Sequence, residues 1–256
     1  MSLFSFKKSQ KQAQTVSYAA QRRNILSQNS SFYVRESYKS LRTNIRFFQA
    51  GEGCRRFCIT SSLAGEGKSI TLLNLAITFA EAGQRVLLID ADLRRPSQAR
   101  LLIERATPGL SNVLAGHCDE NEAIRKSAYP NLDVLFSGEI PPNPSELLGS
   151  PRMKQLIDRL SEQYDYILVD APPVGVVTDA CVVARALDGM LFLVRHNKTE
   201  KEVLARCVQQ IKNAGVRLMG FVINGSEGES GSKYKYSYRK KYKYNYEFVS
   251  RPSKEK

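Results

Sequence analysis

Residues 57–82, FCITSSLAGEGKSITLLNLAITFAEA, decide the fold of this chain. The apolar residues at 57–60 predict a short buried strand, and those at 72–79 recur at the spacing of a helix. A Ser- and Gly-rich loop at 61–69 joins the two. A strand, a tight glycine loop and a helix in this order are typical of a phosphate-binding loop.

The residue types of this loop fit the chemistry of phosphate. Gly65 and Gly67 can adopt backbone conformations that other residues avoid, which brings main-chain N–H groups close to phosphate oxygens. Lys68 can reach the β- and γ-phosphates, so we expect its side chain to face ligand and solvent. Ser69 can bind Mg²⁺ through its hydroxyl group. The candidate nucleotide-binding residues of the loop are Ala64, Gly65, Glu66, Gly67, Lys68, Ser69 and Ile70.

The loop departs from the strict motif at one position. The usual spacing G-x-x-x-x-G-K-[ST] places its first glycine at position 62, where this chain has Ser62. The alternative interpretation is an ordinary turn followed by a helix cap. The strand before the loop, the helix after it and two later strands that end in carboxylates favour the phosphate loop.

Strand-like and helix-like segments alternate along the rest of the chain. Further apolar runs predict strands at 85–90, 132–136, 166–170, 190–194 and 218–224. Helical patterns occupy 32–48, 153–162, 179–186 and 201–214. Continuous apolar strands suit a sheet covered on both faces. We therefore predict an α/β P-loop NTPase fold, a doubly wound and mostly parallel sheet with helices on both faces.

Three carboxylates follow apolar strands. Asp90 and Asp92 finish LLIDAD, and Asp170 finishes YILVD. Any one of them is also explained as a helix or turn cap. Because the carboxyl ends of parallel strands meet at one edge of the sheet, all three are expected near the phosphate loop. Asp170 resembles a Walker B residue, and the predicted Mg²⁺ ligands are Ser69, Asp92 and Asp170.

Composition divides the chain into three parts. Residues 1–30 are Ser-, Gln- and Lys-rich and are interpreted as a mobile arm, residues 31–224 as the P-loop domain, and residues 225–256 as a flexible basic tail. The tail contains the tyrosines Tyr234, Tyr236, Tyr238, Tyr242, Tyr244 and Tyr246. Alternating Tyr and Lys also fits an exposed strand, or a patch that stacks on single-stranded nucleic acid.

Charge and cysteine usage limit the possible partners and compartment. The formal net charge of +13 favours an anionic partner. Five cysteines without a C-x-x-C pair and two histidines suggest neither a disulfide framework nor a zinc site. No apolar run has the length of a membrane span, so a cytoplasmic location is expected.

Three motifs together resemble the bacterial tyrosine kinases (BY-kinases) of capsule and exopolysaccharide synthesis. These are TSSLAGEGKS, LLIDADLRRP and ILVDAPP, and the segments SGEIPPNPSELLGSPRM and ESYKSLRTNI are also similar to that family. The alternative, a MinD/ParA-type ATPase, carries a signature lysine where this chain has Leu63. That absence counts against a non-kinase ATPase switch acting on membrane or DNA.

The resemblance implies an ATP- and Mg²⁺-dependent autokinase that phosphorylates the six tail tyrosines and regulates polysaccharide export. Lys68 and Asp90 are the candidate catalytic residues, with Asp90 orienting the attacking phenol, and Asn224 resembles the adenine-side residue. The implied partners are a membrane adaptor, further copies in a ring with transfer between neighbours, and a cognate tyrosine phosphatase. No nucleic acid is expected, and the implied location is the inner face of the cell membrane.

Two positions depart from the family pattern. The family loop usually has Pro where this chain has Ala64, a change that softens the turn. The family's assembly helix follows E-x-x-R-x-x-R, and here Lys39 stands at the first Arg position between Glu36 and Arg42. Lys does not reproduce a bidentate Arg contact, so assembly through this helix is the less secure expectation.

Overall fold

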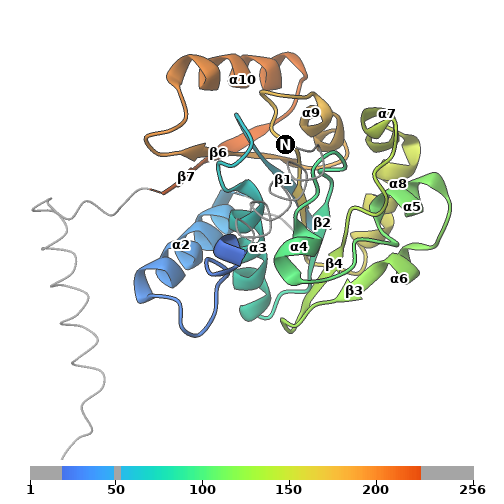
Figure 1. Ribbon diagram of the computed structural model, residues 1–256, viewed down its shortest axis with the longest axis horizontal. Coiled ribbons are helices and arrows are strands. Elements are labelled where there is room, and N and C mark those ends of the chain that lie inside the picture. Colours follow the sequence, from blue (N-terminus) through green and yellow to red (C-terminus); the bar gives the residue numbers. More distant parts are fainter. Residues whose placement is uncertain (1–18, 49–52, 226–256) are drawn as a thin grey trace, which may run out of the picture. The chain divides into compact units, whose positions relative to one another are not determined.

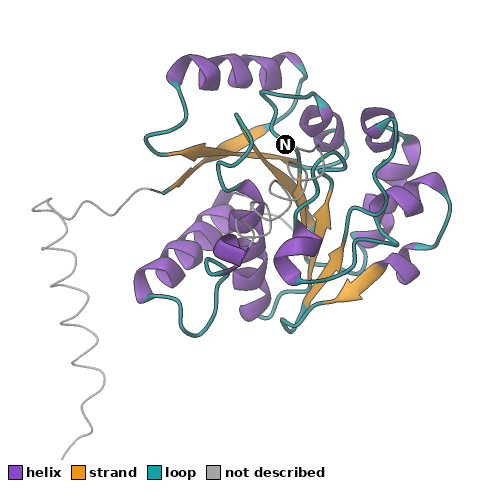
Figure 2. Cartoon of the chain, in the orientation of Figure 1, coloured by secondary structure: helices purple, strands orange, loops and turns teal. Residues whose placement is uncertain are grey.

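The computed structural model describes residues 19–48 and 53–225 of the chain. These residues form a seven-stranded sheet with helices on both of its faces (Figures 1 and 2). The strand order is β3-β4-β2-β5-β1-β6-β7. The strands are β1 (Arg55–Ser61), β2 (Val86–Asp90), β3 (Ile124–Lys126), β4 (Leu132–Leu135), β5 (Tyr166–Asp170), β6 (Gly189–Arg195) and β7 (Leu218–Asn224).

The helices fall between these strands. They are α2 (Phe32–Phe48), α3 (Lys68–Glu81), α4 (Gln98–Leu102), α5 (Leu110–Ala115), α6 (Glu120–Ala123), α7 (Pro144–Leu148), α8 (Pro151–Leu160), α9 (Asp179–Ala184) and α10 (Lys201–Asn213). No helix within residues 19–48 and 53–225 combines the length and apolar character that crossing a membrane requires.

The sheet register brings the predicted site together at one edge. All strand pairs are parallel except the pair of β3 with β4. Asp90 at the end of β2 is the register partner of Asp170 at the end of β5, and Ile59 of β1 is the other neighbour of Asp170. The phosphate loop leaves β1 just beyond this point, so the loop and the strand-end carboxylates converge as parallel pairing requires.

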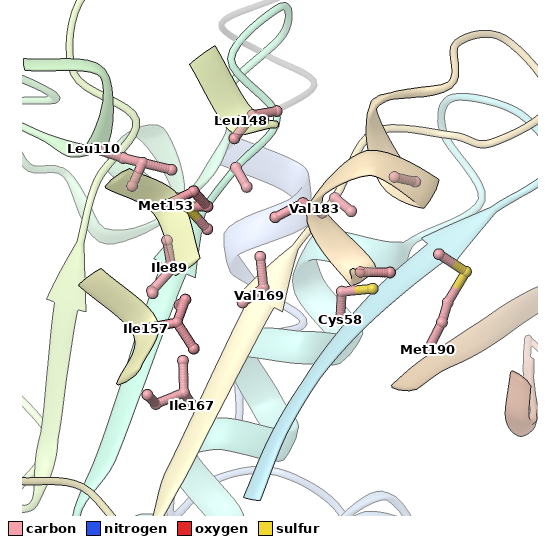
Figure 3. Close-up of a cluster of buried hydrophobic side chains, with 14 of the residues drawn as sticks. Cys58, Ile89, Leu110, Leu148, Met153, Ile157, Ile167, Val169, Val183 and Met190 are labelled. Carbon is pink, nitrogen blue, oxygen red and sulfur yellow. The ribbon is translucent and has the colours of Figure 1, made fainter. Parts of the chain in front are cut away.

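Two hydrophobic cores lie on opposite faces of the sheet. On one face, buried side chains of α3 and α4 pack with Leu26 and with Ile45 of α2. On the other face, residues of α5, α8, α9 and α10 pack against alternate residues of the same strands, as Figure 3 shows for Ile89, Ile167, Ile157 and Val183. The inner strands β2, β5, β1 and β6 are buried on both sides, which explains their continuous apolar sequences, whereas the edge strands β3 and β7 are partly exposed.

The six predicted strands are confirmed to within two residues at each end, and so is the doubly wound fold. Helix α2 matches its predicted bounds, and it packs on α3 through Tyr38, Leu41 and Ile45. The short helices α4 to α7 and the antiparallel edge strand β3 were not predicted. They span three to six residues each, too few for a periodic signal.

The predicted N-terminal arm needs a correction in its second half. Leu26 is only 4% exposed, and its backbone N–H donates to the side chain of Asn74 in α3 over 2.9 Å. The Asn74 amide also donates to the carbonyl of Asn24 over 2.8 Å. The segment 19–30 is therefore anchored to the domain, whereas residues 1–18 lie outside the described residues.

Candidate nucleotide and metal site

The phosphate loop has the backbone that its glycines predict. Gly65 and Gly67 both have positive φ angles, 80° and 99°. A Cβ atom on Gly67 would lie 2.3 Å from Nδ2 of Asn224, so a side chain at this position would displace Asn224 in addition to straining the backbone. Ala64 and Gly65 are exposed at the tip of the loop, while Ser69 and Ile70 lie half-buried in the first turn of α3. The loop thus presents backbone at a helix N-terminus, the arrangement that binds phosphate.

The side chain of Glu66 stabilises the phosphate loop through hydrogen bonds within the protein and does not face the nucleotide. Its side chain is buried, and its carboxylate accepts hydrogen bonds from the backbone N–H of Leu63 (2.9 Å) and from Oγ1 of Thr199 (2.5 Å). Asn224 at the end of β7 donates from Nδ2 to the backbone carbonyl of Glu66 over 2.9 Å. The structure therefore brings the predicted residues Glu66 and Asn224 together, and it adds Thr199, which no motif indicated.

Replacing Thr199 by Val is expected to destabilise the domain by about 1–3 kcal/mol, because the buried Glu66 carboxylate loses a donor. The measurement is the urea dependence of unfolding. The matched control is Thr43→Val on exposed α2, which loses a bond to the Lys39 carbonyl and is expected to cost at most about 0.5 kcal/mol. Equal destabilisation by both variants would contradict the role given to Thr199.

Lys68 lies among the acidic residues of the site. Its Nζ is 3.0 Å from Oδ1 of Asp170, 3.2 Å from Oδ2 of Asp92 and 3.2 Å from Oγ of Ser69. Burial lowers the pKa of Lys68, but the charges of Asp170 and Asp92 outweigh burial and raise that pKa above its usual value. Lys68 is 9% exposed, so the expectation that it faces solvent is wrong for this state of the site. The reason is that the two carboxylates attract the ammonium group inward.

Asp90 holds the turn that follows β2. Its carboxylate is fully buried and accepts hydrogen bonds from the backbone N–H groups of Asp92 (3.3 Å), Ser97 (3.0 Å) and Gln98 (3.0 Å). Burial, followed by the negative charge of Asp170, raises the pKa of Asp90 to about 7. Asp90 thus lies beside the predicted metal ligands, but its oxygens contact backbone rather than open space.

Gln98 connects the parts of the site, and the sequence analysis missed it. Its side chain is fully buried and donates from Nε2 to Oδ2 of Asp170 over 2.8 Å and to the carbonyl of Ser69 over 3.1 Å. The Oε1 atom of Gln98 is buried and has no hydrogen-bond partner among the described residues. The only signal in the sequence was its position in the segment just after the second motif.

Replacing Gln98 by Met is expected to weaken Mg²⁺ affinity in the presence of ADP about 10- to 100-fold, the usual effect of losing a group that orients a metal-binding carboxylate. Met fills a similar volume but cannot orient Asp170. The measurement is a Mg²⁺ titration of fluorescent ADP binding. Gln209→Met on exposed α10 is the control and should leave the titration unchanged. A Gln98→Met protein with the affinity of the control would refute this role.

The residues at the edge of the sheet fit a Mg²⁺ ion and a nucleotide. Ser69, Asp92 and Asp170 supply oxygen atoms around Nζ of Lys68, where a positive charge is already stabilised. Across residues 19–48 and 53–225, no group of three or more His, Cys, Asp or Glu side chains forms a complete metal cage. Mg²⁺ commonly uses one or two carboxylates and completes its shell with phosphate and water, so this donor set is sufficient.

The parallel sheet, the glycine loop at the start of α3 and the carboxylates at the ends of β2 and β5 define a P-loop NTPase. Residues 55–215 match the AAA domain family (AAA_31). The tyrosine-protein kinase YwqD of Bacillus subtilis (strain 168) is 40% identical over 199 residues, which cover 78% of this chain and 84% of YwqD.

Solved structures of a bacterial tyrosine kinase and of a chimerical protein are also similar to this chain. The kinase domain of the Escherichia coli tyrosine kinase ETK is 34% identical with a TM-score of 0.74, covering 78% of this chain and 79% of that one. The chimerical protein CapA2B2 is 33% identical with a TM-score of 0.72, covering 77% and 86%. The chain belongs to the bacterial tyrosine-protein kinase family.

Proposed function

We propose that this chain is an ATP- and Mg²⁺-dependent protein-tyrosine autokinase that phosphorylates its own C-terminal tyrosine cluster and regulates capsular or exopolysaccharide synthesis and export. The observation that carries the proposal is the position of Lys68, which lies at the start of α3 between Asp170 and Asp92. The similarity to the tyrosine kinases YwqD and ETK supports tyrosine as the acceptor of the phosphoryl group. The six tail tyrosines supply that acceptor within the same chain.

Each residue of the site has a defined task in this proposal. The loop N–H groups and Lys68 bind and orient the β- and γ-phosphates, and Asn224 contacts the adenine side. Ser69, Asp92 and Asp170 hold Mg²⁺, which when bound neutralises charge that develops on the transferred phosphoryl group. Gln98 keeps the carboxylate of Asp170 in place for this task.

Asp90 is proposed to orient the attacking phenol. A free tyrosine has a pKa near 10, and because the pKa of Asp90 is raised to about 7, Asp90 is a better proton acceptor than an ordinary carboxylate. Its three backbone hydrogen bonds also fix the turn at residues 92–98. A direct contact with phenol requires at least one of these bonds to be exchanged. Because the pKa of Asp90 stays below that of the phenol, late proton transfer fits better than prior deprotonation.

The test is intact mass measurement and phosphotyrosine mapping after incubation of the purified chain with Mg-ATP. The proposal expects up to six added phosphates, all on residues 234–246, and none without Mg²⁺. ATP hydrolysis without any phosphotyrosine would instead favour a non-kinase ATPase switch. Repeating the measurement with the cytoplasmic segment of a candidate adaptor tests whether a partner activates the enzyme.

An adaptor, assembly and membrane proximity are proposed together. The similar structure CapA2B2 is a chimerical protein, and this chimera supports a second protein component of the system. Assembly through α2 has weaker support, since Lys39 is paired with Glu36 of the same helix over 2.8 Å and Arg42 donates to the carbonyl of Thr78. We propose a peripheral position at the inner membrane face, a cognate phosphatase and transfer between neighbouring copies.

Transfer between copies has its own test. A Lys68→Met chain that retains the tail is mixed with an active chain truncated after Gly231, and phosphate is mapped on the Lys68→Met chain. Phosphotyrosine there supports transfer between subunits. Its absence, with the truncated chain shown to phosphorylate an added tyrosine peptide, excludes that route.

A further inference from the structure

A positively charged cavity lies beside α4, outside the phosphate-loop site. A cavity of about 760 Å³ is lined by four arginines, Arg22, Arg100, Arg105 and Arg125, together with Glu104 and the side chain of Ile103. Three separate segments contribute: the anchored stretch at 19–30, α4 with the turn that follows it, and strand β3. Figure 1 shows α4 next to β2 and β4.

The charges around this cavity are unbalanced. Without counting Arg100, the three arginines Arg22, Arg105 and Arg125 against Glu104 give the lining a formal charge of three minus one, or +2. Within residues 19–48 and 53–225, neither Arg22, Arg105 nor Arg125 forms an ion pair with a carboxylate. Guanidinium groups that share a cavity repel one another, and an anion relieves that repulsion. The lining is thus complementary to an anionic ligand.

Arg125 is fixed in place before any ligand arrives. Its guanidinium group donates hydrogen bonds to the backbone carbonyls of Arg105 and Thr107 and lies 5.6 Å from the centre of the Phe136 ring. These contacts bond no anion, so they leave the positive charge uncompensated. A pre-positioned cation with the more exposed Arg105 beside it is suited to phosphate, which accepts hydrogen bonds from several guanidinium groups.

Ile103 adds an apolar surface at the same cavity. Its side chain is 75% exposed, and its backbone has a φ angle of 60°, a left-handed conformation that is strained for a β-branched residue. Such strain concentrates at functional positions. An exposed apolar side chain next to several guanidinium groups matches a ligand with an apolar body and a phosphate at its end.

We propose that this arginine cavity binds phosphotyrosine, and that its occupant is the phosphorylated tail of this protein. This inference rests on the proposed autokinase function. The unmodified tail carries nine basic and two acidic residues from 232 to 256, a net charge of +7, which the arginines repel. Each phosphotyrosine adds about −1.5 to −2 charges, so phosphorylation converts repulsion into attraction. Docking would occur on α4, whose first residue, Gln98, contacts Asp170.

The test uses a fluorescent peptide of residues 232–246, SKYKYSYRKKYKYNY, made without phosphate and with phosphate on all six tyrosines. Binding to the full-length, unphosphorylated chain is followed by fluorescence anisotropy without nucleotide. We expect the phosphopeptide to bind at least about tenfold more tightly than the unmodified peptide. We also expect Arg22→Ala with Arg105→Ala to reduce phosphopeptide affinity at least about tenfold, since both side chains line the cavity.

Controls separate the cavity from general charge attraction. Arg206→Ala with Arg185→Ala removes two arginines outside the cavity, and this double variant should keep the parent affinity. Competition by O-phosphotyrosine at lower concentration than inorganic phosphate indicates the contact with Ile103, and equal competition indicates a general phosphate site. Equal phosphopeptide affinity in the parent and the Arg22/Arg105 variant would overturn the proposal. The phosphopeptide is synthetic, so failure of binding is distinguishable from absence of kinase activity.

Discussion

Replacement of Lys68 by Met is expected to abolish tail phosphorylation and to destabilise the domain. The catalytic loss, expected to be at least about 10²- to 10³-fold, follows from the removal of a fixed positive charge at the transferred phosphate. The loss of stability follows from the surroundings of Lys68. Without its ammonium group, the buried carboxylates of Asp170 and Asp92 face each other with no cation between them, a change that costs about 3–5 kcal/mol.

The two consequences are measured separately. Phosphotyrosine is quantified by mass spectrometry, and the free energy of unfolding by urea denaturation with and without Mg²⁺. Because Mg²⁺ replaces part of the lost charge, it should stabilise the Lys68→Met protein more than the parent. The control Lys154→Met removes an exposed lysine that pairs with Asp158 and should change neither quantity. Retained phosphotyrosine in the Lys68→Met protein would contradict the assignment of the loop.

Asp170→Asn and Asp90→Asn are expected to separate metal binding from phosphoryl transfer. Asp170 contacts Lys68 with one carboxylate oxygen and Gln98 with the other. Its replacement should weaken Mg-ADP binding at least about tenfold. Asn at position 90 still accepts a backbone N–H bond, so binding should change less than about threefold. The rate of tail phosphorylation should nonetheless fall about 100-fold, because the Asn amide cannot accept the proton of the phenol.

Calorimetric titration with ADP at saturating Mg²⁺ measures the first effect, and the initial rate of phosphotyrosine formation measures the second. Thermal unfolding of both proteins shows whether a loss of affinity reflects a loss of fold. If Asp90→Asn weakens Mg-ADP binding as much as Asp170→Asn, then Asp90 belongs to the metal site and the separate role proposed for it is wrong.

The positions of the strands and their carboxylates were predictable because they depend on local chemistry. A run such as YILVD is apolar along its length and ends in one charge, and only a buried parallel strand that ends at a polar edge accommodates that pattern. The register pairing of Asp90 with Asp170 confirms the predicted convergence. The loop glycines were predictable for the same reason, since their positive φ angles are a property of the local turn.

The contacts that complete the site depend on tertiary structure and left no local signal. Gln98 reaches Asp170 because the turn at residues 92–98 folds back on Asp90, and an amide in a polar turn has no pattern of its own. Thr199 meets Glu66 across more than 130 residues of sequence. Leu26 is one isolated apolar residue in a polar segment, so its burial against α3 could not be inferred from periodicity. The tail tyrosines lie outside the described residues.

The bond between Asn224 and the phosphate loop determines where the tail is tethered. Asn224 donates to the carbonyl of Glu66, and the tail starts one residue later, at Gly225. Whatever its conformation, a chain of that length keeps Tyr246 within about 79 Å of Asn224, at 3.3–3.6 Å per residue. One tyrosine confined to such a sphere has an average local concentration on the order of 1 mM. A free peptide at micromolar concentration is therefore expected to compete poorly with a tail tethered at this distance, whether the tail belongs to the same chain or to a neighbouring copy in the proposed assembly.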